Sequence, residues 1–357
     1  MNTITIKTQS KEYLSMIGHG ASELLAPFLK EKFPNVTKIL IITDENIAKL
    51  HLAEFERKVA GFDFITYVVP GGEKAKTFDV YYQLLTYCLE QKLDRKSLLL
   101  SFGGGAVGDV SGFVAGTFMR GIPFIQIPTT ILAHDSAVGG KVAINHPLGK
   151  NMIGVFHQPE AVIYDLDYLE TLTLVEKRSG FAEVVKEALI SDKYFYEWLI
   201  TNITSLESLQ SEQLAYFLSE AMKIKGQIVS EDERETGVRA YLNLGHTLGH
   251  AIEAELGYGN ITHGEAVAIG TIFSIELSQE LLGFDFDRQK LVQWLKGLGY
   301  MTELPKHLDS QNLINRMKLD KKSIGQKVNF VLLEKIGMPK IVEIEDAFLL
   351  KKLEEFK

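Results

Sequence analysis

Hydrophobic and polar positions divide the chain into two halves with different periods. Residues 3–8 alternate apolar and polar side chains, which predicts a strand, and 13–17 offers it a partner. Residues 38–43 form a continuous apolar run, which is typical of a strand buried on both faces of a parallel sheet. Further strands are predicted at 62–69, 97–102, 124–130 and 161–164, with helical patterns among them. This succession predicts a doubly wound α/β domain.

From residue 167 onward the pattern is helical. Helices are predicted over 179–187, with Ser179 as the capping residue, and over 219–229, and a strand-like segment follows at 327–333. A chain of 357 residues exceeds the usual size of one core, so we expect two domains. The expectation is an α/β N-terminal doubly wound nucleotide-binding domain over 1–165 and an all-α C-terminal metal-binding domain over 166–357.

Composition narrows the class of protein. The formal net charge of -8 argues against a general nucleic-acid surface, although local lysines can still bind an anionic small molecule. The sequence begins without a charged-then-apolar leader and has no apolar run of membrane-spanning length, so we expect a soluble, cytoplasmic protein without a membrane partner. The single Cys88 lies in a helical, apolar stretch and is expected to be a buried thiol.

A glycine-rich turn at 103–109 connects a predicted strand to a predicted helix. Glycines let the backbone approach a pyrophosphate, and the N–H groups at a helix start bind anions. Gly103, Gly105 and Gly108 match the dinucleotide fingerprint, but the turn follows a late strand and no acid stands after the next strand. A glycine turn without a ligand is the alternative interpretation.

Polar side chains elsewhere in the first half extend the nucleotide hypothesis. Asp44 and Asn46 follow the strand at 38–43, where they can bond ribose hydroxyls or simply cap the next helix. Lys141 and Lys150 flank a turn in a polar, glycine-rich passage. Most surface lysines are only solvated, but lysines in a glycine-rich setting favour a phosphate ligand.

Three of the nine histidines fall between positions 246 and 263. His246 and His250 are four residues apart, so a helix would present both on one face, and His263 lies nearby. Neutral imidazoles at this spacing are typical zinc ligands, and the alternative is a helical pair that only caps or packs. No Glu follows His246, which disfavours a metalloprotease.

Charged residues near the histidines allow two interpretations. Glu183 and Lys186 are three residues apart on a predicted helix, either as a surface ion pair or as a metal ligand beside a substrate-facing lysine. Arg239 lies four residues before Asn243 and seven before His246, so it can point into the same pocket.

Over nearly its whole length the chain resembles the 3-dehydroquinate synthase family. The resemblance rests on long motifs in the same order, at 103–109, 127–130, 135–141, 149–154, 179–186, 242–250, 263–265 and 320–322. One departure is the segment between Thr130 and Asp135, which is one residue shorter than in the family pattern Thr-Thr-Leu-Leu-x-Gln-Val-Asp.

The resemblance implies a set of ligands and roles. It implies Zn²⁺ or Co²⁺ held by Glu183, His246 and His263, so that His250 would face the substrate instead of the metal. It implies NAD bound by Asp44, Asn46, Glu73, Lys76, Gly104, Gly105, Val107, Gly108, Asp109, Thr129, Thr130, Lys141, Lys150 and Thr171. The substrate would meet Asp135, Lys141, Asn151, Lys186, Lys225, Arg239, Asn243, His250 and Lys321 or Lys322. Arg120 would reach this pocket from a second subunit, which implies a homodimer.

The activity implied by the resemblance belongs to the shikimate pathway, which leads to chorismate and the aromatic amino acids. It converts 3-deoxy-D-arabino-heptulosonate 7-phosphate into 3-dehydroquinate and phosphate, as a carbon–oxygen lyase with recycled NAD. Three alternatives stay open: another sugar phosphate cyclase, a metal-dependent polyol dehydrogenase of the glycerol type, and an inactive binding module.

Overall fold

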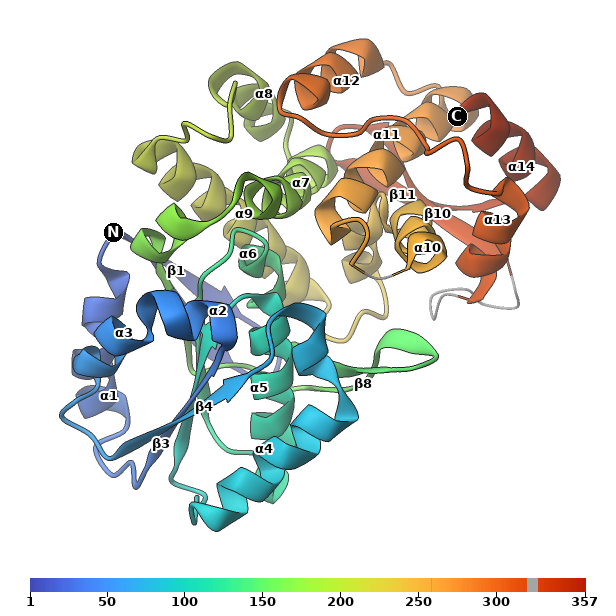
Figure 1. The fold of residues 1–357 in the computed structure, drawn as a ribbon. Coiled ribbons are helices and arrows are strands. Elements are labelled where there is room, and N and C mark those ends of the chain that lie inside the picture. The colour runs from blue at the N-terminus through green and yellow to red at the C-terminus, as the bar shows by residue number, and fades with distance from the viewer. Residues whose placement is uncertain (258, 320–326) are drawn as a thin grey trace. The chain divides into compact units, whose positions relative to one another are not determined.

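The structure is a computed structural model that describes residues 1–257, 259–319 and 327–357. The chain forms two compact units (Figure 1), of which the first holds Met1–Leu172 and Leu214–Arg234. The second holds Thr173–Gln213 and Glu235–Lys357. The boundary expected from the sequence, after residue 165, differs from this division because most of helix α9 (Ser211–Glu231) returns to the first unit. There Ser219 of α9 accepts a hydrogen bond from Asn2 Nδ2 at 3.0 Å, a long-range contact that no local pattern indicates.

Within the described residues, the first unit is built on a seven-stranded sheet. Its order is β1 (Asn2–Lys7), β2 (Glu12–Gly18), β9 (Ala161–Asp165), β6 (Phe124–Pro128), β5 (Leu98–Gly103), β3 (Ile39–Asp44) and β4 (Phe64–Val69). The expected pairing of the first two strands is confirmed and is antiparallel, and the other neighbours pair in parallel. The chain therefore winds outward in both directions from the middle of the sheet.

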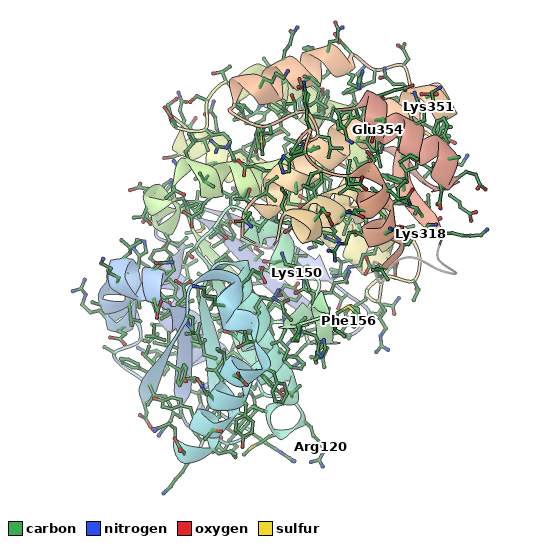
Figure 2. All side chains as sticks on the ribbon, turned by 45° about the vertical axis from the view of Figure 1, so that its right-hand side comes forward. Arg120, Lys150, Phe156, Lys318, Lys351 and Glu354 are labelled. Carbon is green, nitrogen blue, oxygen red and sulfur yellow. The ribbon has the colours of Figure 1, made fainter. Side chains whose placement is uncertain are left out.

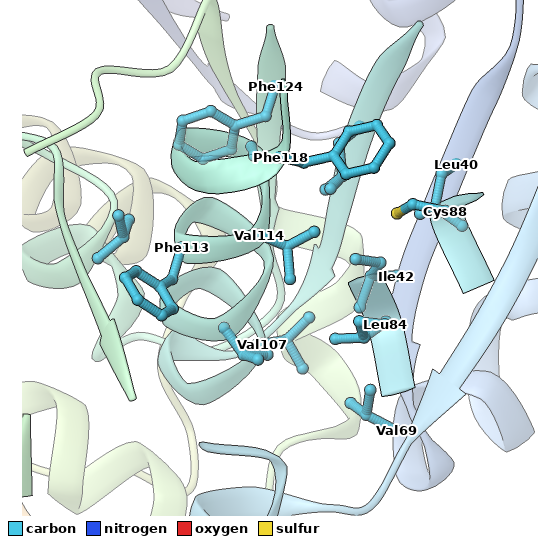
Figure 3. Close-up of a cluster of buried hydrophobic side chains, with 14 of the residues drawn as sticks. Leu40, Ile42, Val69, Leu84, Cys88, Val107, Phe113, Val114, Phe118 and Phe124 are labelled. Carbon is cyan, nitrogen blue, oxygen red and sulfur yellow. The ribbon is translucent and has the colours of Figure 1, made fainter. Parts of the chain in front are cut away.

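Two hydrophobic cores cover the two faces of this sheet. Successive residues of a strand point to opposite faces, so Leu40 and Ile42 of β3 enter one core and Ile39 and Ile41 enter the other. Helices α4 (Phe78–Glu90) and α5 (Gly105–Thr117) lie over the first face, and α1 (Leu25–Lys32) and α3 (Ala53–Lys58) lie over the second (Figure 1). Cys88 lies in the first core, as expected (Figure 3). The doubly wound prediction is confirmed.

A β hairpin replaces the loop-like passage of the sequence. Strands β7 (Lys141–His146) and β8 (Gly149–Phe156) pair in antiparallel fashion, and Val142 and Ile144 of β7 are buried in the core beside α5. The remaining short elements of the unit are η1 (Ala21–Leu24), α2 (Glu45–Ile47), the π-helical turn η2 (Ala48–Leu52), η3 (Gly72–Lys76), η4 (Phe118–Arg120), α6 (Ala133–Ser136) and η5 (Leu166–Thr171).

The second unit is helical, as expected, and includes one hairpin among its described residues. Its helices are α7 (Leu174–Ser191), α8 (Lys193–Asn202), η6 (Val238–Asn243), α10 (His246–Leu256), α11 (His263–Leu282), α12 (Arg288–Gly297), α13 (Ser310–Leu319) and α14 (Asp346–Glu355). The predicted strand at 327–333 is β10 (Val328–Lys335), which pairs with β11 (Met338–Ile344). None of the helices in the described ranges is both long enough and apolar enough to cross a membrane.

Helix α7 begins earlier than the sequence analysis expected. Thr173 is its capping residue, and the Thr173 side chain and Glu176 form a complete capping box. Ser179, the expected cap, is inside the helix and buried. The expected start was wrong because the Thr-x-x-Glu pattern six residues upstream is the stronger signal.

Candidate active-site residues in the two units

The predicted nucleotide-binding residues gather at one edge of the sheet. Parallel strands end at the same edge, and the segments after five of them carry predicted cofactor residues: Asp44 and Asn46 after β3, Glu73 and Lys76 after β4, Gly104 to Asp109 after β5, Thr129 and Thr130 after β6, and Thr171 after β9. The chain leaves β3 and β5 in opposite directions, so these neighbours form the topological switch point where ligands bind open α/β sheets.

This order explains the irregular position of the glycine fingerprint. The turn follows the fifth strand along the chain, β5, because that strand borders the switch point. An acid does stand at the end of the neighbouring strand, as Asp44 of β3, and not after the next strand in sequence.

The glycines of the turn are needed for close approach. A Cβ on Gly104 would lie 2.9 Å from Thr130 Cγ2, and one on Gly105 would lie 3.0 Å from Ser136 Oγ. A Cβ on Gly108 would lie 2.8 Å from Gln126 Oε1, so this glycine allows α5 to pack on β6. Within the described residues, no side chain caps the N-terminus of α5, which leaves its N–H groups for an anion.

Buried hydroxyl groups line the same turn. Thr129 Oγ1, Thr130 Oγ1 and Ser136 Oγ are buried and have no hydrogen-bond partner among the described residues. Buried polar atoms are nearly always bonded, so these three fit a polar ligand. The side chain of Val107, in contrast, lies in the hydrophobic core, and only its backbone can meet a cofactor.

A polar network connects the segment after β4 to α5 and the hairpin. Lys76 is 2% exposed, and its Nζ lies 2.6 Å from Asp109 Oδ2 and donates a hydrogen bond to Asn151 Oδ1. Glu73 lies 3.3 Å from Lys150 Nζ and 3.8 Å from Lys76 Nζ. The network therefore joins four predicted cofactor residues to Asn151, which the sequence analysis assigned to the substrate.

Two carboxyl groups of this network respond differently to burial. Burial opposes ionisation of Glu73, but Lys76 and Lys150 outweigh it, so the pKa of Glu73 lies below its ordinary value. For Asp109, burial outweighs the attraction of Lys76, and its pKa is raised. The two pKa values shift in opposite directions because Glu73 is the more exposed of the two and has two ammonium neighbours.

Asp44 and Thr171 both have structural contacts of their own. Asp44 Oδ1 accepts hydrogen bonds from Asn46 N at 2.8 Å and Ile47 N at 3.2 Å, so the capping alternative is realised. Thr171 Oγ1 lies 2.9 Å from His51 Nε2. These contacts hold both residues at the switch edge and leave their cofactor roles as predictions.

Among the predicted substrate residues of the first unit, Asp135 and Lys225 form an ion pair, whereas Lys141 and Arg120 are exposed. Lys225 of α9 is buried, its Nζ lies 2.9 Å from Asp135 Oδ2, and it also donates to the Asp135 carbonyl. Lys141 is exposed on the hairpin. Arg120 is exposed at the surface of the unit (Figure 2). It follows the far end of α5, roughly 20 Å along the helix from the glycine turn, since each residue rises about 1.5 Å.

The second unit brings Glu183, His246 and His263 together. Glu183 Oε1 lies 3.4 Å from His246 Nε2 and 3.2 Å from His263 Nε2, and the Glu183 side chain is 1% exposed. Zinc binds such atoms at about 2.0–2.2 Å, which places two ligands of a tetrahedral ion roughly 3.3–3.5 Å apart. The donor atoms therefore fit a metal ion. The ring of His250 lies 5.3 Å from that of His246 and 5.7 Å from that of His263.

The protonation state of His246 suits a metal ligand. Its pKa lies well below the ordinary value because burial disfavours the imidazolium, and this outweighs the attraction of Glu183. His246 Nδ1 lies 3.1 Å from the Leu244 carbonyl oxygen. A carbonyl can only accept, so Nδ1 carries the proton and Nε2 presents its lone pair on the side of Glu183.

Glycines set the spacing of the three helices that carry these donors. A Cβ on Gly264 of α11 would lie 1.9 Å from the Ser179 carbonyl oxygen of α7, and Gly264 N donates to Ser179 Oγ at 3.2 Å. A Cβ on Gly270 would lie 2.0 Å from the Gly245 carbonyl oxygen, just before α10. Close packing of α7, α10 and α11 thus places Glu183 beside both histidines.

The other predicted residues of this unit are charged groups near the same helices. Lys186 Nζ lies 2.6 Å from Glu183 Oε2, and both side chains are 1% exposed, so the surface-ion-pair alternative is wrong. Arg239 is buried in η6, and Asn243 Nδ2 donates to Glu235 Oε1 at 3.2 Å. Lys321, with the whole 320–322 motif, lies outside the described residues.

Sequence reasoning missed two acids of this unit. Glu253 is buried, and its Oε2 lies 2.8 Å from His263 Nδ1. Its spacing of seven residues from His246 places both on one helical face, and this signal was present in the sequence. Glu235 has a left-handed backbone with φ 59°, which has no sequence signal for a glutamate.

Known proteins match the chain along most of its length. The 3-dehydroquinate synthase N-terminal model matches residues 66–179, and the 3-dehydroquinate synthase C-terminal model matches residues 180–323. The 3-dehydroquinate synthase of Geobacillus kaustophilus is 52% identical over 355 residues, which cover 99% of this chain and 97% of that protein. That of Bacillus cytotoxicus is 49% identical over 358 residues, which cover 100% of this chain and 97% of that protein.

A solved structure shares the fold. The crystal structure of 2-deoxy-scyllo-inosose synthase complexed with carbaglucose-6-phosphate, NAD+ and Co2+ superposes with a TM-score of 0.90, with 100% of each chain covered and 24% identity. At that identity the match speaks for the fold only. The sequence relatives decide the family. With half of its residues identical to theirs over almost the full length, the chain belongs to the 3-dehydroquinate synthase family.

Proposed function

We propose that this chain is a 3-dehydroquinate synthase. It converts 3-deoxy-D-arabino-heptulosonate 7-phosphate into 3-dehydroquinate and inorganic phosphate, as a carbon–oxygen lyase. The observation that carries the proposal is the convergence of Glu183 with His246 and His263 at tetrahedral ligand spacing, in a chain of this family.

The proposal assigns cofactor roles to residues of both units. Glu183, His246 and His263 hold a divalent ion, Zn²⁺ or Co²⁺, and the switch-point edge of the sheet holds NAD. When bound, the ion would supply a Lewis acid for a substrate oxygen, and NAD would supply a reversible hydride acceptor. The N–H groups at the start of α5 bind the pyrophosphate, and Asp44 bonds a ribose hydroxyl.

Charged side chains bind the substrate in this proposal. Arg239 and Lys225, both buried, provide the fixed positive charge that a carboxylate needs in a protein whose net charge is -8. Lys186 keeps an ammonium beside Glu183 Oε2, where it can donate to a substrate hydroxyl. His250 lies next to both histidine ligands and is placed to move a proton to or from the substrate.

A homodimer is part of the proposal, and the hairpin supports it. Val142 and Ile144 of β7 are buried, whereas Met152 and Phe156 of β8 are 55% and 45% exposed. Figure 2 shows the position of Phe156. An exposed apolar hairpin surface is unusual for a monomer. Arg120 is too far along α5 to serve the glycine turn of its own chain, so we assign it to the pocket of a second subunit.

The first test separates a lyase from a dehydrogenase. Purified protein is mixed with trace NAD, Co²⁺ or Zn²⁺, and the heptulosonate phosphate, and NADH absorbance and free phosphate are followed together. A synthase releases one phosphate per substrate, forms dehydroquinate, and never builds up NADH beyond the enzyme concentration. Steady NADH accumulation without phosphate would instead identify a polyol dehydrogenase. Phosphate release with a different carbocycle would identify another sugar phosphate cyclase.

The second test concerns the metal ligands. His263→Ala is expected to lose bound metal and turnover together, because an open site with three protein ligands tolerates no loss. His250→Ala is the matched variant: it should keep its metal and lose turnover. Full metal occupancy in His263→Ala would contradict the assignment and favour the pair His246 and His250.

A further inference from the structure

We propose that Glu253 is a positioning residue that fixes the ring orientation and the tautomer of His263. The inference rests on the metal site of the proposed function. Glu253 belongs to α10 and His263 to α11, and Glu253 Oε2 lies 2.8 Å from His263 Nδ1. The opposite ring nitrogen, Nε2, lies 3.2 Å from Glu183 Oε1, on the side of the proposed ion.

The two contacts involve different nitrogens of the His263 ring, Nδ1 with Glu253 and Nε2 with Glu183. An ionised carboxylate can only accept hydrogen bonds, so the Glu253 contact requires the proton on His263 Nδ1. That tautomer leaves the lone pair on Nε2, where a metal ligand needs it. A carboxylate behind a ligand histidine also makes the imidazole a stronger donor and prevents the ring from turning. Glu253 binds the far nitrogen, so it does not compete for the ion.

Because the Glu253 carboxylate is buried, its contact with His263 differs from an ion pair at the surface. The Glu253 side chain is 5% exposed and that of His263 is 22% exposed. Removing a carboxylate from water is costly unless it gains strong hydrogen bonds, so a glutamate at this position needs a partner such as His263. Surface pairs, by contrast, contribute little and hold no fixed geometry.

The backbone of α10 and α11 holds the pair in place. A Cβ on Gly249 would lie 3.2 Å from the backbone of Ala266, so the helices pack closely at this level. Glu253 is one turn beyond Gly249 on the same helix. Helix α10 thus supplies one metal ligand directly, His246, and the support of a second ligand through Glu253.

The two proposed histidine ligands are supported differently. His246 Nδ1 is held by a neutral backbone carbonyl, that of Leu244, at 3.1 Å. His263 is held by a carboxylate, which can be removed by mutation without touching a ligand. Glu253 is therefore a side chain through which metal affinity can be changed while all three proposed ligands remain.

The experiment compares Glu253→Gln and Glu253→Ala with the wild type and with Glu255→Gln. Glu255 is on the same helix but pairs with Arg316 at 3.2 Å, away from the histidines, and serves as the control. Co²⁺ affinity is measured by competition with a chelator, and the Co²⁺ absorption band reports ligand geometry. We expect Glu253→Ala to bind Co²⁺ about 10–100-fold more weakly, with an altered band, and Glu255→Gln to match the wild type.

The glutamine variant tests charge separately from shape. Its amide oxygen can still accept from Nδ1, so we expect partial retention of affinity, between the wild type and the alanine variant. It also covers the case in which the alanine variant fails to fold. Wild-type affinity and spectrum in both folded variants, or equal loss in Glu255→Gln, would overturn the inference.

A metal-free measurement separates this inference from the proposed function. Side-chain ¹⁵N shifts of the histidines report which nitrogen carries the proton. We expect His263 Nδ1 to carry a proton in the wild type, whether or not Nε2 is also protonated beside Glu183, and this protonation of Nδ1 to be lost in Glu253→Ala. If the wild type bound no Co²⁺, the metal site would be wrong, and the tautomer shift would still decide the role of Glu253. An unchanged tautomer would refute it.

Discussion

Replacing Gly264 by alanine is expected to loosen the proposed metal site without touching a ligand. A Cβ at this position would lie 1.9 Å from the Ser179 carbonyl oxygen and 2.5 Å from the Ser179 carbonyl carbon. Both are backbone atoms, so no side chain can turn away. Reaching even 3.0 Å, the closest separation that a real Cβ tolerates, requires α7 and α11 to separate by about 1.1 Å.

The size of the effect follows from that displacement. His263 is the neighbour of Gly264, so its Nε2 moves with α11 away from Glu183 Oε1, from 3.2 Å to roughly 4 Å. One tetrahedral ion spans only about 3.3–3.5 Å between ligands, so metal affinity should fall at least about tenfold. Overpacking of this kind costs about 1–3 kcal/mol, or roughly 2–12 °C in thermal midpoint.

Two measurements and one control test this prediction. Calorimetry gives the thermal midpoint of the metal-free protein, and chelator competition gives the Co²⁺ affinity. Gly297→Ala is the matched control, because a Cβ there meets nothing within 4 Å and α12 should tolerate or prefer alanine. If Gly264→Ala kept the wild-type affinity and a midpoint within about 1 °C, close helix packing would not set the ligand spacing.

Three further outcomes are expected. Burial raises the pKa of the Cys88 thiol to about 12, so a disulfide exchange reagent at pH 8 should label it only after unfolding; fast labelling of the native protein would contradict its burial. Thr173→Ala should lower the free energy of unfolding by about 1 kcal/mol in denaturant titrations, since it removes the capping box of α7. The lowered pKa of His246 means that the unfolded chain takes up a proton below about pH 6.5 that the folded chain does not, so the metal-free protein should lose stability as the pH falls, and less so in His246→Gln.

One prediction concerns the nucleotide edge. Lys76→Met should weaken NAD binding by about 1.5–3 kcal/mol, because it removes the buried ammonium that connects Asp109 and Asn151. Titration calorimetry measures this loss. Lys74→Met, in the same short helix η3 but exposed, is the control, and equal NAD affinity in both variants would place the nucleotide elsewhere.

Local periodicity was sufficient for most of the fold. The continuous apolar run of β3 indicates a strand buried on both faces of the sheet. The alternation of β1 indicates a strand buried on one face. The hairpin β7–β8 was missed because the glycine and polar residues around its turn, such as Asn145, Pro147 and Gly149, are typical of a loop in the sequence. The return of α9 was missed because a contact such as Asn2 with Ser219 leaves no trace in either segment alone.

The site was predicted less completely, for a related reason. Helical spacing alone favoured His246 and His250, because such spacing relates only residues of the same helix. The carboxylate of Glu183 joins the histidines through the crossing of α7 with α11, a tertiary contact. Family resemblance supplied that grouping, which stays a prediction, because the ligand atoms of His246, His250 and His263 also lie within 4.8 Å of one another.

The return of α9 also decides how the chain can be divided. Because the chain enters the first unit twice, no single cut yields two fragments that each contain one whole unit. A fragment of residues 1–172 would lack Ser219, the partner of Asn2, and Glu233, which accepts from Gln158 Nε2 at 2.8 Å. It would also uncover Ile6, whose Cδ1 faces Gly226. The border between the two family models lies at residues 179 and 180. It therefore divides the sequence at a place that is not a border between the two structural units. A self-sufficient first unit would have to carry residues 214–234 on a new linker.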